Sequence, residues 1–209
     1  MTKIRRAVSI AEIMSKKFKD IPFTGDWKNL LGEPEMSGMW IIWGQSFNGK
    51  TSFCLQLAKE LTKYGKVLYN SMEEGVRKSM QEAIARNHML DVKDKFHLIN
   101  EPIDSLKLRL NRKKQAEIIF IDSLQYSDLN KVEYKKLKAA FPNKLFVLVS
   151  HAEGKQPKGR FADFVRYDCD IKIRVEGYKA FCMSRLSNNT NSEYVIWHMG
   201  ANAYWGNNL

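Results

Sequence analysis

The sequence has few cysteines and no long hydrophobic run. Cys54, Cys169 and Cys182 are odd in number and far apart, and without a CxxC pair or a Cys/His cluster neither a disulfide framework nor structural zinc is expected. Apolar runs such as residues 39–43 are much shorter than the roughly 20 residues of a membrane span. Charged residues interrupt the N-terminus before the apolar core of a secretory signal could form. These absences predict a cytoplasmic protein that does not enter a membrane.

Negative charge is scarce as well. The chain has 23 acidic against 34 basic residues and a net charge of +11, which favours polyanionic partners such as nucleic acid. Its 209 residues, 44% of them hydrophobic and 27% charged, are ordinary for one globular domain with an appendage. Residues 1–37 are mostly polar and are interrupted by glycine and proline, whereas continuous apolar runs begin after Gly38. We therefore expect an N-terminal basic arm or linker over residues 1–37 and a core over residues 38–209.

Strands that are apolar throughout alternate with helices up to His151, which is typical of a parallel sheet covered on both faces. The alternation then stops, and three successive strands favour an antiparallel extension. We therefore predict an α/β fold with a mostly parallel central sheet, flanking helices and a C-terminal antiparallel extension. In the arm, one short helix over residues 9–19 is expected, followed by no regular element. The predicted strands are 39–43, 66–71, 95–99, 117–122, 145–150, 170–175, 179–185 and 193–199, and the other helices are 50–63, 75–88, 103–113 and 131–140.

One segment fits the pattern GxxxxGK[ST] at every fixed position, between a predicted strand and a predicted helix. The glycines permit turns that aim backbone N–H groups at phosphate oxygens, and the helix N-terminus adds its positive end. Lys50 would reach the β- and γ-phosphates, and the Thr51 hydroxyl can coordinate Mg²⁺. The residues predicted to bind the nucleotide are Gly44, Gln45, Ser46, Phe47, Asn48, Gly49, Lys50, Thr51 and Ser52.

Three polar residues end neighbouring strands at the same edge of the predicted sheet. Asp122 follows the run 118–121 and is expected to hold Mg²⁺ with Thr51, although it could simply cap the strand. Glu73, or its neighbour Glu74, is expected to orient the attacking water, with stabilisation of the next helix as the alternative. His151 is expected to sense the γ-phosphate, unless it is only a solvated strand end.

Several segments together resemble the RecA/RadA/DnaB superfamily of P-loop ATPases, and most closely the ATPase core of the bacterial RadA (Sms) type. They are 44–51, the phrase Val67-Leu68-Tyr69-Asn70-Ser71-Met72-Glu73-Glu74, 118–122 and Val149-Ser150-His151. The resemblance implies a RecA-like core that binds ATP between head-to-tail subunits of a homo-oligomer, with DNA as the usual regulator. It also implies that Arg185 reaches nucleotide phosphates. The chain departs from the pattern two positions earlier, where relatives often carry Lys and this chain has Met183.

Residues 151–167 correspond to the region where those relatives contact single-stranded DNA. The candidate DNA-binding cations Lys155, Lys158, Arg160 and Arg166 alternate there with Phe161, Phe164 and Tyr167, and cations beside aromatic faces suit sequence-tolerant strand binding. The alternative is a solvated loop followed by a core segment in which the two phenylalanines are buried. The second basic cluster, residues 107–114, is expected to be a solvated helix face.

These features favour an ATPase stimulated by single-stranded DNA that acts as a homo-oligomer, a ring or a filament, in recombination, repair or replication. Lys50, Thr51 and Asp122 would hold Mg²⁺ and ATP, Glu73 would position water, and Arg185 would complete the site. The first alternative is a KaiC-like module that binds ATP, hydrolyses it slowly and acts on a protein partner. A small-molecule P-loop kinase is a second alternative, disfavoured because no Arg-rich lid is evident.

Overall fold

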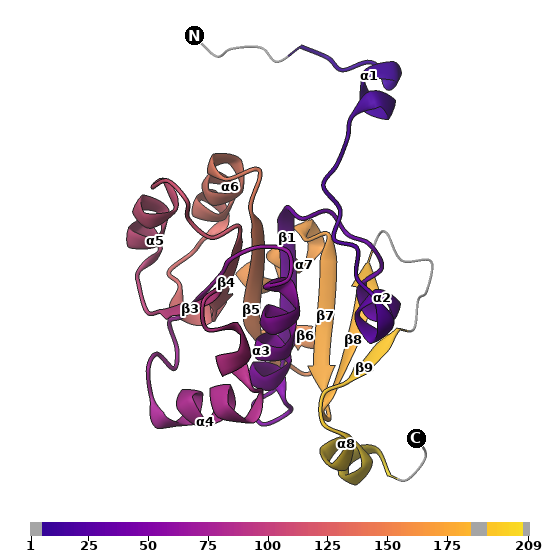
Figure 1. The fold of residues 1–209 in the computed structure, drawn as a ribbon, viewed down its shortest axis with the longest axis vertical. Helices are drawn as coiled ribbons and strands as arrows, with labels where there is room; N and C mark the ends of the chain where they lie inside the picture. The colour runs from indigo at the N-terminus through magenta and orange to yellow at the C-terminus, as the bar shows by residue number, and fades with distance from the viewer. Residues whose placement is uncertain (1–5, 185–191, 207–209) are drawn as a thin grey trace.

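The structure, a computed structural model, describes residues 6–184 and 192–206 (Figure 1). Its main sheet has the strand order β3-β2-β4-β5-β1-β7-β8-β9, and the two-residue strand β6 pairs with the end of β5. In that order the strands are β3 (Phe96–Ile99), β2 (Val67–Ser71), β4 (Ile118–Asp122), β5 (Leu145–Glu153), β1 (Gly38–Gly44), β7 (Ile171–Glu176), β8 (Lys179–Ser184) and β9 (Glu193–Val195), with β6 at Gln156–Pro157.

The predicted α/β fold class is confirmed. Strands β3 to β7 along the order are parallel neighbours, whereas β8 and β9 extend the sheet in antiparallel pairing. Every residue of β2 and of β4 is buried, as expected for parallel strands with helices on both faces. Parallel strands all present their carboxyl ends at one edge, so the residues after β1, β2, β4 and β5 meet there.

Helices cover both faces of the sheet. Alternate residues of β1 point to opposite layers, with Trp40 and Ile42 in one core cluster and Ile41 and Trp43 in the other. The first layer holds α2 (Gly25–Leu31), α3 (Lys50–Leu61) and α4 (Lys78–Arg86), and the second holds α5 (Ile103–Leu110), α6 (Lys131–Ala140) and α7 (Arg160–Asp168). Two short 3₁₀ helices connect these elements: η1 (Met89–Val92) lies between α4 and β3, and η2 (Leu124–Tyr126) lies between β4 and α6. Among the described helices none is long and apolar enough to cross a membrane.

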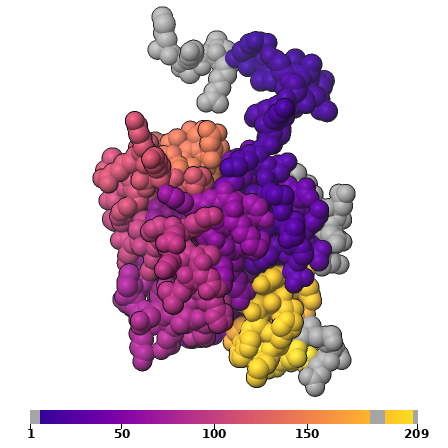
Figure 2. Space-filling model, in the orientation of Figure 1, coloured from indigo at the N-terminus to yellow at the C-terminus, as the bar shows by residue number. Residues whose placement is uncertain are grey.

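The N-terminal segment divides into an exposed part and a packed part. Helix α1 (Ile10–Ser15) is capped by Ser9 and Glu12, and it stands away from the body on an extended arm (Figures 1 and 2). Contrary to the expectation of no regular element after it, α2 forms, and Leu30 and Leu31 are fully buried. Trp27, Leu30 and Leu31 have the i, i+3, i+4 spacing of one helix face. The packed body therefore begins near Asp20 rather than at Gly38.

The C-terminal third also contains helices that the sequence pattern did not predict. Helix α7 replaces the second part of the predicted loop over residues 151–167, and α8 (His198–Trp205) begins inside the predicted strand 193–199, of which only Glu193–Val195 is a strand. The chain turns into α8 where Trp197 packs directly over Gly200, since a Cβ at Gly200 would collide with the indole ring. Helix α8 lies at the end of the body opposite α1 (Figure 1).

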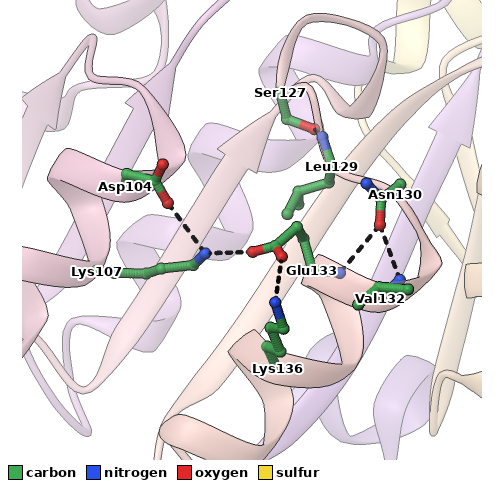
Figure 3. A network of polar contacts seen from close by, with 8 residues as sticks. All are labelled: Asp104, Lys107, Ser127, Leu129, Asn130, Val132, Glu133 and Lys136. Carbon is green, nitrogen blue, oxygen red and sulfur yellow. Dashed lines mark hydrogen bonds and ion pairs between the residues drawn. The ribbon is translucent and has the colours of Figure 1, made fainter.

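Ion pairs join α5 to α6 on the outer surface (Figure 3). Lys107 Nζ lies 2.7 Å from Glu133 Oε2 and 3.1 Å from Asp104 Oδ1, and Glu133 also binds Lys136 at 2.9 Å. Arg109 in the same basic cluster is paired with Glu101. Part of the 107–114 charge therefore supports the packing of helices.

Candidate functional site

The loop between β1 and α3 places an open helix N-terminus at the carboxyl edge of the sheet. Gly49, the N-cap of α3, has φ 91°, and no side chain caps the helix. Any residue other than glycine would be strained in this left-handed backbone conformation. A Cβ atom at position 49 would also lie only 3.0 Å from the Tyr178 ring. The first-turn N–H groups of α3, next to Lys50 and Thr51, are therefore available to an anion.

The turn between β7 and β8 holds this loop in place. The Gly177 N–H donates to Asn48 Oδ1 at 2.8 Å, and the Tyr178 N–H donates to the Asn48 carbonyl at 3.1 Å. Gly44 lies so close to Val175 that a Cβ would overlap its carbonyl oxygen. The predicted residues Gly44, Gln45 and Asn48 thus face the end of β7. They support the conformation of the loop from the side away from the cavity described below.

Asp122 ends β4 beside the loop and is largely buried. Its Oδ2 accepts a hydrogen bond of 2.6 Å from the Tyr69 hydroxyl, which comes from the neighbouring strand β2. Burial raises the pKa of the Asp122 carboxyl, while the Tyr69 hydrogen bond and the nearby charge of Lys50 lower it. A carboxylate is thus held close to Lys50 in a poorly solvated position.

Glu73 is fixed by two side chains from the neighbouring strands. Its Oε2 accepts a hydrogen bond from Ser123 Oγ at 3.0 Å and lies 2.7 Å from His151 Nε2. Gln125 clamps the same region, because its Oε1 accepts the His151 N–H and its Nε2 donates to Ser150 Oγ and to the Lys158 carbonyl. His151 therefore contacts Glu73 and, through Gln125, is linked to the hairpin of β5 and β6.

One cavity of about 640 Å³ is lined by the loop after β1, Glu73 and Asp122, and its size suits a nucleotide. His151 is not on its wall and reaches it through Glu73. The predicted residues on its wall are Ser46, Phe47, Gly49, Lys50, Thr51, Ser52, Glu73, Glu74 and Asp122. Five further wall residues were missed: Arg77, Ser79, Arg86, Tyr126 and Tyr178. Arg77 could have been predicted, because it follows Glu73 in the segment after β2. Nothing in the sequence indicated Tyr178, because only the folded turn between β7 and β8 brings it to the loop.

The oxygen atoms at the cavity suit Mg²⁺. Thr51 offers a hydroxyl and Asp122 a carboxylate, and Mg²⁺ is usually held by one or two such protein groups together with phosphate oxygens and water. Over residues 6–184 and 192–206, no cluster of three or more His, Cys, Asp or Glu is placed to hold a metal by itself. The residues therefore fit a cation that arrives with a phosphate ligand.

The predicted DNA loop has a different structure. Phe161 and Phe164 pack edge-on against Tyr134, with ring centroids 6.2 and 6.0 Å apart, so they belong to the second core layer. Arg166 pairs with Asp163 at 2.9 Å. Of the candidate residues, the exposed cations are Lys155, Lys158 and Arg160.

The expected role of Arg185 falls on a position outside the described residues. Met183, where relatives often have Lys, lies on β8 and is half-exposed.

The strand order, the glycine-rich loop after β1 and the carboxylate ending β4 define a RecA-like P-loop fold. Solved structures that share this fold include two archaeal proteins. The KaiC-like protein PH0186 from the archaeon Pyrococcus horikoshii OT3 has a TM-score of 0.63 and 15% identity, over 85% of this chain and 94% of that one. The flagellar accessory protein FlaH from Methanocaldococcus jannaschii has a TM-score of 0.58 and 17% identity, over 85% and 93%. No protein-family model and no curated protein matches the chain.

Proposed function

We propose that this protein binds ATP with Mg²⁺ and hydrolyses it. The observation that carries the proposal is the shared cavity, whose wall unites the open α3 N-terminus, Lys50, Asp122 and Glu73. Lys50 and the first-turn N–H groups would hold the β- and γ-phosphates, and Thr51 and Asp122 would hold the cation. Bound Mg²⁺ would neutralise charge that develops on the transferred phosphoryl group.

Glu73, rather than Glu74, is proposed to orient the attacking water. Ser123 and His151 fix the Glu73 carboxylate, and a fixed carboxylate is what general-base catalysis needs. No hydrogen bond of this kind is recorded for Glu74 among the described residues, although it lines the same cavity. His151 would then report on the nucleotide through its contact with Glu73.

Steady-state ATP hydrolysis tests this proposal. Lys50→Ala should abolish the activity, because the phosphates lose their main cation. Glu73→Gln should lower kcat by about 100-fold or more and leave nucleotide affinity nearly unchanged, whereas Glu74→Gln should cause a far smaller loss. Equal activity of Lys50→Ala and wild type would contradict the mechanism, and equal losses at the two glutamates would contradict the assignment of Glu73.

We further propose that single-stranded DNA stimulates hydrolysis through the β5–β6 hairpin, in a protein of DNA recombination, repair or replication. Lys155 in the hairpin turn, Lys158 directly after β6 and Arg160 at the start of α7 are exposed. Hydrogen bonds from Trp43 to the Lys155 carbonyl and from Gln125 to the Lys158 carbonyl link this segment to the site. With three cations on phosphates, the log–log salt slope of binding would be about −2.

Stimulation by single-stranded DNA should disappear in Lys155→Ala/Lys158→Ala and persist in the matched pair Lys113→Ala/Lys114→Ala, whose lysines are exposed outside the hairpin. Loss of DNA stimulation in both double variants would indicate that stimulation depends on the overall positive charge rather than on the hairpin.

Absence of any stimulation, together with ATP-dependent oligomers in light scattering, would favour the alternative function. In that case the chain is a KaiC-like homo-oligomeric module with slow hydrolysis that acts on a protein partner. The fold shared with PH0186 and FlaH supports this alternative equally well.

A further inference from the structure

Tyr69 is a fully buried tyrosine directly behind the candidate metal site. Its ring stacks on Phe120, with centroids 5.2 Å apart and an angle of 14° between the planes, because the two residues are register partners on β2 and β4. Asp122 lies two residues after Phe120 and so points to the same face of the sheet. The Tyr69 hydroxyl therefore meets the Asp122 carboxylate, to which it donates the 2.6 Å hydrogen bond.

The helix that carries the other candidate metal ligand packs on the same side of the sheet as Tyr69. Cys54 of α3 and Tyr69 are fully buried members of one core cluster, and Cys54 follows Thr51 by three residues, almost one helical turn. Tyr69 thus belongs to the core layer between the helix that supplies Thr51 and the strand that supplies Asp122.

We infer that Tyr69 is a positioning residue for the Mg²⁺ site, an inference that rests on the proposed function. Its hydroxyl occupies Oδ2 of Asp122 and leaves the other carboxylate oxygen for the cation. Without this donor, the carboxylate would lose its only recorded side-chain hydrogen bond among the described residues and would be free to rotate. Outer hydrogen bonds of this kind typically change metal affinity by 10- to 100-fold when they are removed.

A purely structural role for Tyr69 predicts different behaviour, and the chain offers a matched control. Tyr134 is also fully buried, and its hydroxyl donates to Asp168 Oδ2 at 2.7 Å. It lies in the opposite core cluster and is not on the wall of the nucleotide cavity. Replacing either tyrosine by Phe removes one buried hydroxyl from one aspartate.

The experiment is a Mg²⁺ titration of ATP-analogue binding by calorimetry, with binding in EDTA measured separately. In Tyr69→Phe, the Mg²⁺ concentration for half-saturation should rise by about 10-fold, while affinity in EDTA stays within about 2-fold of wild type. Tyr134→Phe should match wild type in both measurements. Thermal unfolding of each variant verifies that it is folded, and the Phe ring preserves the stack on Phe120.

A double-mutant cycle with Asp122→Asn tests whether the hydroxyl acts through Asp122. In the Asp122→Asn background, Tyr69→Phe should cause no further change in Mg²⁺ dependence. An additive loss, an unchanged Mg²⁺ titration in Tyr69→Phe, or an equal shift in Tyr134→Phe would overturn the inference alone. Wild-type binding that ignores Mg²⁺ would overturn the proposed function as well.

Discussion

Two carboxylates, Asp122 and Glu133, occupy opposite environments in this molecule. Asp122 is buried at the sheet edge, where burial raises its pKa. Glu133 lies at the surface between α5 and α6, where hydrogen bonds from Lys107 and Lys136 lower its pKa to about 2 (Figure 3). Burial opposes the charge of Asp122, and neighbouring cations favour that of Glu133. The comparison teaches that the poorly solvated carboxylate suits ligand binding at a cost in stability, whereas the paired one supports the fold.

The largest expected effect is on hydrolysis. Asp122→Asn should lower Mg²⁺-dependent ATP hydrolysis by about 100-fold or more, because a neutral amide is a poor ligand for a hard cation. Glu133→Gln should leave the rate within about 2-fold of wild type, since Glu133 lies outside the cavity proposed to bind the nucleotide. A steady-state assay at saturating ATP measures both. Comparable losses in the two variants would break the contrast.

The second prediction concerns thermal stability in EDTA at pH 7, where the two substitutions should shift the melting temperature in opposite directions. The pKa of Asp122 is raised above its ordinary value of 3.8, so the folded state loses stability as pH rises past that value and the group ionises. Asp122→Asn removes the buried charge and should raise the melting temperature by about 3 °C. Glu133→Gln should lower it by about 1 °C. Calorimetric melting curves test the signs, and a lower melting temperature for Asp122→Asn would contradict the argument.

The smallest expected effect is the pH dependence of the Glu133 network. Because its pKa falls from 4.5 to about 2 on folding, the stabilisation is complete above about pH 4.5 and is lost as pH falls toward 2. The difference in denaturant midpoint between wild type and Glu133→Gln should therefore be constant at neutral pH and shrink below pH 4.5. A difference that persists at pH 2.5 would show that packing, rather than charge, explains the Glu133→Gln effect.

The parts of the site that could be predicted from the sequence are those whose chemistry is local. The loop at Gly44–Thr51 and the carboxylate after the apolar run of β4 are specified by consecutive residues, and the parallel sheet brings them to one edge. Tyr178 could not be predicted, because it reaches the cavity only through the turn that binds Asn48. The role of Tyr69 depends on the register of β2 against β4, and no pattern of consecutive residues predicts that register.

The errors in the fold arose where tertiary packing decides. Phe161, Phe164 and Val165 have helical spacing, but the surrounding glycines and lysines favoured a loop, and contact with Tyr134 determines the outcome. Helix α2 was missed for a similar reason, since it begins at Gly25 and ends before Gly32, and its stability comes from burying Leu30 and Leu31. The proposed DNA contact consequently depends on fewer residues than the sequence suggested.

The indole of Trp43 gives the molecule an optical property. Trp43 is buried at the end of β1, next to the glycine-rich loop that follows it, and its Nε1–H donates to the Lys155 carbonyl in the hairpin at 3.1 Å. Trp197 and Trp205, by contrast, are about half-exposed and emit from a wetter environment. Trp40 on the same strand is equally buried, so a Trp40→Phe variant is needed to isolate the signal of Trp43. In that variant, a shift on the blue side of the fluorescence band during titration with nucleotide would report movement of the hairpin relative to β1, without any attached dye.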